Sequence, residues 1–412
     1  MFYGYIIVLV VFVVSLIGWV MYSAYGVFFE PTLKEFGWTR AVTSGPYSLY
    51  IVVQGLLSIV VGKVNDRFGP KAITIVCGLS FSLGYFLLAQ MSAIWQLYLF
   101  FGVLLGIGMA CIWVPLLSTV ARWFVERRGL MCGIVTAGIS LSIAVMPLLA
   151  SWSISNYGWR TSYIIFAVVT FAIIVVAALF LKRDPSQMGL SPYGEGEAKG
   201  KNLNSDVLGL SLGEAFRTRQ FWIFCGIATS ITLLSTLVIV HIVIHASGLG
   251  IPAFKAASIV SVNGVAGILG AILIGHLADR IGNKPTLVII TISYICSLLW
   301  LLVAGELWMF YLFAVVFGAA FAGFFTVQSP VVAELFGLRS HGIIFGVLYS
   351  ITMVGAALGP ILAGYIFDIT DSYQLAFWIG SGIAVSGFIL ALLLKPINLE
   401  RKIHRFTPIG KE

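Results

Sequence analysis

Charged side chains are scarce in this sequence. Asp, Glu, Lys and Arg make up 10% of the 412 residues, whereas 60% are hydrophobic and the mean hydropathy is +1.03. A soluble domain carries about a quarter charged residues. The shortage of charge excludes a soluble globular domain and indicates a protein whose surface faces lipid.

Motifs for metal, nucleotide or catalytic chemistry are also missing. The five cysteines all fall within apolar runs and form no C-x-x-C pair: Cys77, Cys111, Cys132, Cys225 and Cys296. The sequence has no H-E-x-x-H, no paired acids or Ser/His pair at one depth, and no G-x-x-x-x-G-K-[ST]. We therefore expect no catalytic residues, no metal site, no cofactor and no enzyme activity. The net charge of +8 comes without a basic soluble face, so we expect no nucleic-acid partner.

Long apolar runs are abundant instead. A helix needs about 20 apolar residues to cross the hydrocarbon core of a bilayer. The runs are continuous rather than alternating, so they indicate helices and not barrel strands. We predict an all-α membrane protein with twelve transmembrane helices, within about 4–28, 42–62, 72–91, 95–121, 129–152, 161–181, 221–246, 254–276, 285–304, 307–333, 342–366 and 374–395.

The positions of Lys and Arg predict the orientation in the membrane. With a cytoplasmic N-terminus, the inner loops and tail hold 20 of the 24 Lys and Arg residues, and the outer loops hold only Lys34, Arg40, Arg160 and Lys255. Basic residues concentrate on the cytoplasmic side of membrane proteins. We predict a multi-pass protein of the cell inner membrane with both termini in the cytoplasm.

The two halves of the sequence repeat each other. The stretch "GKVNDRFGPK" at 62–71 returns as "GHLADRIGNK" at 275–284, an offset of 213 that also relates Gly129 to Gly342. A polar segment rich in Gly and Ser separates the sixth and seventh runs. We predict two pseudo-symmetric six-helix bundles at 1–182 and 219–396, a cytoplasmic linker at 183–218 and a cytoplasmic tail at 397–412.

Both copies of this stretch match the loop signature G-x-x-x-D-[RK]-x-G-x-[RK], and the sequence resembles the major facilitator superfamily over nearly its full length. Further phrases, including "WFVERRGLMCGIVTAGISL" and "YGWRTSYIIF", look like the monocarboxylate-porter and oxalate/formate-antiporter relatives. The resemblance implies a secondary active transporter that works by alternating access. It also implies a small organic anion as substrate, with proton coupling in the monocarboxylate branch.

The repeated stretch is also a candidate conformational latch. Gly62 allows close helix approach, and Asp66 can accept hydrogen bonds from the exposed amides of the helix that begins near Gly342. Arg67, Arg127 and Arg128 can then join a cytoplasmic ion-pair network. The second copy adds Asp279 and Arg280 to the predicted latch.

One departure from the relatives bears on the substrate. Those relatives carry an arginine in the helix that corresponds to 254–276 here, and this sequence has an apolar residue at that position, near Ala271. A carboxylate at the membrane midplane without a cation is costly by several kcal/mol. Two readings stay open: a transporter of a small organic acid, favoured as a monocarboxylate with proton coupling, or a facilitator or exporter of a neutral or hydrophobic compound. A membrane receptor or enzyme on the same fold is a third, weaker alternative.

Few polar side chains remain to form a site inside the helices. His241 and His245 share one helix face and titrate near neutral pH, so we predict a role for them in proton coupling. The predicted substrate-binding residues are His241 and a set of aromatic and amide side chains: Tyr22, Tyr25, Tyr50, Gln54, Trp113, Asn263, Phe325, Gln328 and Tyr349. The expected partners are a small-molecule substrate, protons and the lipid bilayer, and we expect a monomer.

Overall fold

The computed structural model describes residues 2–38, 40–194 and 209–395. The predicted tail and the central part of the predicted linker lie outside the described residues. The first half contains α1 (Tyr3–Gly18), α2 (Val20–Phe36), α3 (Arg40–Phe68), α4 (Pro70–Leu88), α5 (Ile94–Leu97), the π-helix η1 (Tyr98–Leu105), α6 (Gly106–Ala110), α7 (Trp113–Trp123) and α8 (Arg128–Phe180). The 3₁₀-helix η2 (Pro185–Met188) and α9 (Leu212–Phe216) follow, and the second half contains α10 (Arg219–Gly248), α11 (Ala253–Ile281), α12 (Asn283–Leu301), α13 (Leu307–Phe336), α14 (His341–Thr370) and α15 (Gln374–Leu393).

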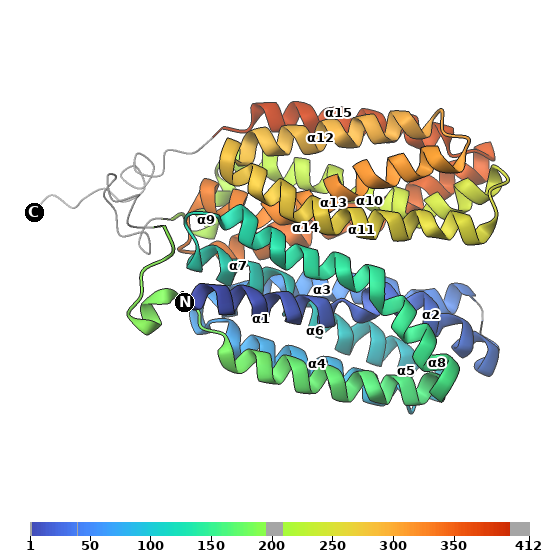
Figure 1. The fold of residues 1–412 in the computed structure, drawn as a ribbon, viewed down its shortest axis with the longest axis horizontal. Helices are drawn as coiled ribbons and strands as arrows, with labels where there is room; N and C mark the ends of the chain where they lie inside the picture. The colour runs from blue at the N-terminus through green and yellow to red at the C-terminus, as the bar shows by residue number, and fades with distance from the viewer. Residues whose placement is uncertain (1, 39, 195–208, 396–412) are drawn as a thin grey trace, which may run out of the picture.

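The described residues form two bundles of six membrane-crossing segments each. Eleven stretches are long and apolar enough to cross a membrane, and the longest, α8, contains two of the predicted helices. Its backbone leaves the helical conformation at Gly158, with φ 77° and ψ 160°. Glycine adopts such a positive φ without a steric penalty. The prediction of twelve helices is confirmed, and Figure 1 shows the halves side by side.

The repeated stretch is mostly helical and not a loop. Residues 62–68 complete α3, and Gly69 then turns the chain with φ 80° before Pro70 opens α4. Gly282 makes the same turn between α11 and α12 with φ 92°. Both positions need glycine because a side chain strains the backbone at positive φ.

The two halves meet along two pairs of helices, α3 with α14 and α8 with α11. A β-carbon on Gly62 would collide with the carbonyl oxygen of Gly342, and one on Gly129 would collide with that of Gly275. These four glycines are related in pairs by the offset of 213. Backbones that touch without side chains between them form the closest helix crossings available in a membrane.

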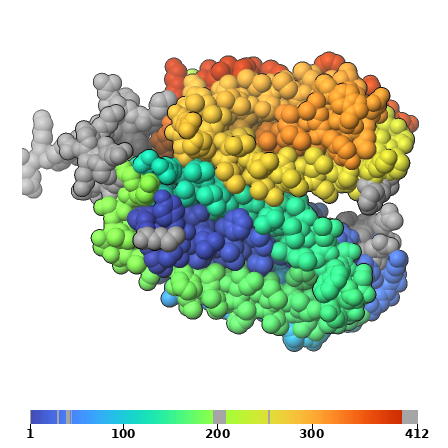
Figure 2. Space-filling view, in the orientation of Figure 1, coloured from blue at the N-terminus to red at the C-terminus, as the bar shows by residue number. Residues whose placement is uncertain are grey.

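These contacts lie near one end of the molecule. We call this end the linker face, which carries the start of α1, the short helix α9 and the start of α14. The opposite end, which carries the end of α2 and the connection between α10 and α11, is the distal face. Figure 2 shows the halves in contact toward the linker face and a gap between them toward the distal face.

We expect Gly62→Ala to weaken closure of the linker face. The added methyl group must displace the backbone at Gly342, and overpacking costs about 1–3 kcal/mol. Spin labels at the exposed residues Lys63 and Arg339 should report a longer distance between the halves in the variant. Gly264→Ala is the matched control, because its β-carbon would meet its nearest neighbour, Ile143, at an ordinary 3.7 Å. An unchanged distance distribution in Gly62→Ala would contradict the expectation.

Candidate functional site

A cavity of about 830 Å³ lies between the two halves. Its walls come from α2, α3, α8, α10, α11, α13 and α14. On α3 and α14 the lining ends at Gln54 and Tyr349, on the side toward the linker face, and it continues past Ser48 toward the distal face. The Gln54 amide donates to the Tyr349 hydroxyl at 2.8 Å, so a hydrogen bond between the halves forms the floor of the cavity.

Six of the predicted substrate-binding residues line this cavity: Tyr22, Tyr25, Gln54, Asn263, Phe325 and Tyr349. Asn263 comes from α11, and its side-chain amide has no hydrogen-bond partner in the described part of the chain. The Tyr25 hydroxyl is engaged, because it donates to the carbonyl of Thr43. The Asn263 amide is therefore the freer group for a ligand.

Three predicted residues lie behind the cavity wall. The indole of Trp113 donates to the amide oxygen of Gln328 at 3.4 Å, and both side chains are buried. The ring of Trp113 packs against Phe325 at 5.3 Å and Tyr349 at 6.4 Å, which do line the cavity. Tyr50 is also fully buried. These three residues support the wall and do not form it, which corrects the prediction of direct contact.

The two histidines of α10 also lie away from the cavity lining. His241 places Nδ1 3.0 Å from the Tyr373 hydroxyl and Nε2 3.0 Å from the Pro360 carbonyl oxygen. Burial raises the pKa of Tyr373, so its hydroxyl stays protonated and can donate to Nδ1. His245 packs among the rings of Phe310, Tyr373 and Phe377. The spacing correctly puts both histidines on one face, but that face packs on α14 and α15.

Several lining residues were not predicted from the sequence. Phe313, Phe317 and Phe321 precede the predicted Phe325 on α13, and all four line the cavity at successive i, i+4 positions. That spacing was a readable signal, since residues four apart share a helix face. Trp19 and Tyr47 also line the cavity from the first half, and no sequence pattern distinguished them from packing aromatics.

At the linker face, a carboxylate near the end of α3 binds the backbone amides at the start of α14. Asp66 accepts hydrogen bonds from the backbone amides of Gly342 at 3.0 Å and Ile343 at 2.9 Å, at the first turn of α14. The same carboxylate forms an ion pair of 3.0 Å with Arg122, whose guanidinium also donates to the Leu338 carbonyl. Arg122 and Asp66 are only 7% and 13% exposed, so little water screens this pair.

Arg122 is therefore the ion-pair partner of Asp66, and the arginines predicted from the sequence for the latch are not. Arg67 is exposed and lies over its neighbour Phe68, and Arg127 lies 3.9 Å from its neighbour Glu126. Arg128 donates to the Phe124 carbonyl, and Arg280 is exposed at the end of α11. None of these four arginines bridges the halves by an ion pair within the described residues. Arg122 was missed because it lies just after an apolar run and outside the repeated stretch.

The second copy of the signature forms half of the same arrangement. Asp279 accepts from the amides of Gly129 at 2.7 Å and Leu130 at 2.8 Å, at the start of α8. Within the described chain no Lys or Arg lies within ion-pair distance of Asp279. The pseudo-symmetric contacts thus differ in one respect, because only Asp66 is neutralised by a buried arginine.

His341 joins the halves beneath the same closure. Its Nδ1 lies 2.9 Å from the Ser118 hydroxyl of α7, and its Nε2 lies 3.1 Å from the Ser329 carbonyl oxygen of α13. The side chain is completely buried. His341 was not predicted from the sequence, because a single residue at the start of an apolar run gives no pattern.

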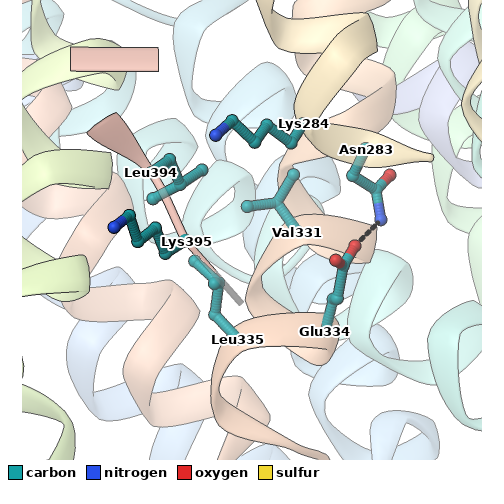
Figure 3. Close-up of a pocket in the computed structure, with 7 residues that line it drawn as sticks. All are labelled: Asn283, Lys284, Val331, Glu334, Leu335, Leu394 and Lys395. Carbon is teal, nitrogen blue, oxygen red and sulfur yellow. Dashed lines mark hydrogen bonds between the residues drawn. The ribbon is translucent and has the colours of Figure 1, made fainter. Parts of the chain in front are cut away.

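A second, much smaller pocket lies on the linker face between α12, α13 and the end of α15. Asn283 donates to Glu334 there, with Lys284 and Lys395 nearby (Figure 3). Its volume of about 20 Å³ is close to the space that one water molecule needs. An organic substrate does not fit, so the large central cavity is the candidate binding site.

Comparisons with known proteins agree with this architecture. The family model described as Major Facilitator Superfamily matches residues 9–305 and 235–408. Monocarboxylate transporter 13 of Rattus norvegicus is 26% identical over 391 residues, covering 93% of this chain and 87% of the relative. The MFS-type transporter YhjX of Escherichia coli is 28% identical and covers 79% of this chain and 80% of the relative. Among solved structures, the transporter FucP in the outward conformation has a TM-score of 0.73 at 15% identity, covering 96% of this chain and 99% of that one.

The chain belongs to the major facilitator superfamily, whose members are membrane transporters and not enzymes. The match to FucP supports the fold alone, given the low identity. Transporters of this fold bind substrate between the two halves and expose it to one side of the membrane at a time. The cavity and the closure of the linker face fit these two requirements. The general function is thus secondary transport of a small molecule.

We expect the two signature aspartates to contribute unequally to closure. Asp66→Asn leaves Arg122 buried without its anionic partner, and breaking a buried pair costs about 3–5 kcal/mol. Asp279→Asn loses only the interaction of an anion with a helix start, about 0.3–2 kcal/mol. The label pair at Lys63 and Arg339 should therefore separate more often in Asp66→Asn than in Asp279→Asn.

Asp184→Asn serves as the control for this comparison, because Asp184 pairs with its neighbour Arg183 and not across the halves. Equal effects of the Asp66 and Asp279 variants would show that Arg122 contributes nothing to closure.

Proposed function

We propose that this protein is a secondary active transporter of a small organic acid, a monocarboxylate, across the cell inner membrane. The observation that carries the proposal is the central cavity itself, which lies between the halves and is closed on the linker face. Relatives named monocarboxylate transporters cover most of this chain at 24–26% identity and support the substrate class.

Alternating access follows from the position of the closure. In the present arrangement the cavity lies on the distal side of the Gln54–Tyr349 hydrogen bond. Opening of the linker face requires that Asp66 release the start of α14 and that Asp279 release the start of α8. Rocking of one half against the other breaks these contacts and exposes the bound substrate on the opposite side.

The orientation in the membrane belongs to the same proposal. The linker face carries Lys63, Arg122, Arg183 and Arg339, and basic residues favour the cytoplasmic side. We place the linker face and both termini in the cytoplasm, with the bundles at 1–182 and 219–396 working as the two moving bodies of a monomer. The distal opening then faces outward.

A second candidate is a facilitator or exporter of a neutral or hydrophobic compound. The cavity lining of the described chain contains no Asp, Glu, Lys, Arg or His, and Ala271 is buried where relatives carry an arginine. A neutral ligand needs no fixed cation. The two candidates differ in whether the ligand has a carboxyl group.

The proposal predicts that purified protein in liposomes takes up labelled lactate or pyruvate faster than empty liposomes do, and faster still when the interior is alkaline. The Asp66→Asn protein should transport at least about tenfold more slowly, because its linker face closes poorly. Asp184→Asn should transport normally. No uptake of either acid by protein that is folded would reject the monocarboxylate proposal and favour the neutral ligand.

A further inference from the structure

The two ends of the linker pair with equivalent loops in the two halves. Tyr193, near the first end, donates its backbone amide to the Trp123 carbonyl at 3.0 Å. Leu210, near the second end, donates its backbone amide to the Phe336 carbonyl at 2.8 Å. Trp123 and Phe336 are related by the same offset of 213 that relates the two copies of the signature. Two different stretches of the linker therefore occupy the same place in the two halves.

Each of these loops leads directly into a helix start that binds a signature aspartate. The loop at 124–127 continues into α8, whose first amides bind Asp279. The loop at 337–340 continues into α14, whose first amides bind Asp66. The amides at a helix start have no preceding helical turn to bond with, so the path of the loop before them determines where they point. Whatever holds the loops therefore holds the amides that receive the two carboxylates.

The first end of the linker contacts its loop beside a strained residue. Arg127, the last residue before α8, has a φ of 60°, a left-handed conformation that is costly for a residue with a side chain. Such a conformation persists only where the surrounding structure holds it. The Tyr193 carbonyl accepts from the amides of Val125 at 3.0 Å and Glu126 at 3.1 Å, and the Tyr193 ring lies 5.9 Å from the Arg127 guanidinium. These contacts fix the loop directly before α8.

The second end of the linker holds its loop where that loop receives the buried arginine. Arg122 donates across the halves to the Leu338 carbonyl at 2.9 Å. Leu338 lies between two residues that the linker touches. Phe336 accepts the linker amide, and the backbone nitrogen of Arg339 would lie only 2.9 Å from a β-carbon on Gly209. A shift of the linker at this point would therefore move the carbonyl that Arg122 binds.

This second end is also anchored by contacts of its own. Leu210 is completely buried. Directly after it, the Ser211 amide donates to the Glu214 carboxylate at 2.7 Å, and the Glu214 amide donates to the Ser211 hydroxyl at 3.4 Å. Reciprocal bonds of this kind form a capping box, which fixes the direction in which a chain enters a helix, here α9. The linker therefore presents a fixed edge to the loop.

We propose that the two ends of the linker are positioning elements for the closure of the linker face. The first end, 193–194, positions the start of α8 for Asp279. The second end, 209–210, positions the start of α14 for Asp66. Each end acts through its own loop, so closure depends on the linker as well as on the two bundles. The inference goes beyond the proposed function, because it holds for any substrate that the cavity carries.

Gly209→Ala tests the second end, and Gly213→Ala is its matched control. The first change must displace the backbone of Arg339, whereas a β-carbon on Gly213 would meet no atom of the described residues within 4 Å. Spin labels at the exposed residues Lys63 and Arg280, on the full chain in lipid nanodiscs, report the ratio of closed to open molecules. We expect Gly209→Ala to lower this ratio at least about twofold, the lower end of the coupling between residues in contact. Gly213→Ala should leave it unchanged, and an unchanged ratio in Gly209→Ala would overturn the proposal for this end.

The first end has a matched pair of its own. Gly194 and Gly189 both have a positive φ, 85° and 67°, so alanine strains the backbone at either position. Only at Gly194 would the β-carbon also collide with the loop, at the side chain of Glu126. We expect Gly194→Ala to lower the ratio of closed to open molecules at least about twofold relative to Gly189→Ala. Equal ratios in the two variants would reject a role of the first end.

Combination with the signature aspartates distinguishes positioning from a general loss of stability. Gly209→Ala should lower the ratio by a smaller factor in Asp66→Ala, where no carboxylate binds the start of α14, than in Asp279→Ala. Gly194→Ala should show the opposite dependence, because its loop precedes α8. Equal factors in both backgrounds would overturn the proposal. The measurement needs no substrate, so its outcome is independent of the proposed function.

Discussion

The arrangement of the two halves depends on one kind of interaction, the hydrogen bonds that a carboxylate accepts from the free backbone amides at the start of a helix. Asp66 occupies this position on α14, and Asp279 occupies it on α8. Each carboxylate belongs to one half and each helix start to the other, so both contacts exist only while the linker face is closed. The glycines around them are part of the same constraint, because a side chain at Gly62 or Gly129 would hold the helix start out of reach of the carboxylate. Because the two backbones touch at these glycines, a small rotation of one half is enough to break the hydrogen bonds of Asp66 and Asp279.

The cavity takes its form from that closure. α3 meets α14 and α8 meets α11 toward the linker face, and the space between the halves begins on the distal side of Gln54 and Tyr349. The residues that line the cavity are those on the helix faces that point toward the space between the halves. From α13 this is the face with a phenylalanine at every fourth residue, and from the first half it is a face of Trp and Tyr side chains. An apolar wall therefore stands opposite a wall of hydrogen-bonding groups, and the described residues of both walls carry no fixed charge.

This lack of charge limits what the cavity can hold. An uncharged lining accepts a neutral group more readily than an anion, because no cation offsets the cost of removing a negative charge from water. The histidines of α10 do not alter this balance, because His241 is engaged by Tyr373 and Pro360 and His245 packs among rings near α15. The buried ion pair of Arg122 and Asp66 lies at the closure and not in the cavity lining.

Much of this architecture could be predicted from the sequence. Continuous apolar runs fix the number of membrane helices, since the bilayer leaves few alternatives for a polar backbone. The offset of 213 identifies Asp66 and Asp279, and likewise Gly129 and Gly342, as equivalent positions in the two halves. A repeated motif repeats its local geometry. The spacing of amides and aromatics identified Tyr22, Gln54, Asn263 and Tyr349, but the same reasoning placed Tyr50, Trp113 and Gln328 in the lining when they lie behind it. A helix carries polar and aromatic residues on several faces, and only its packing against other helices decides which face meets the cavity. For the same reason the partner of Asp66 was decided by tertiary structure alone: Arg67, Arg127 and Arg128 lie near the repeated signature or its equivalent helix start, but Arg122 is the arginine that packing brings to the carboxylate.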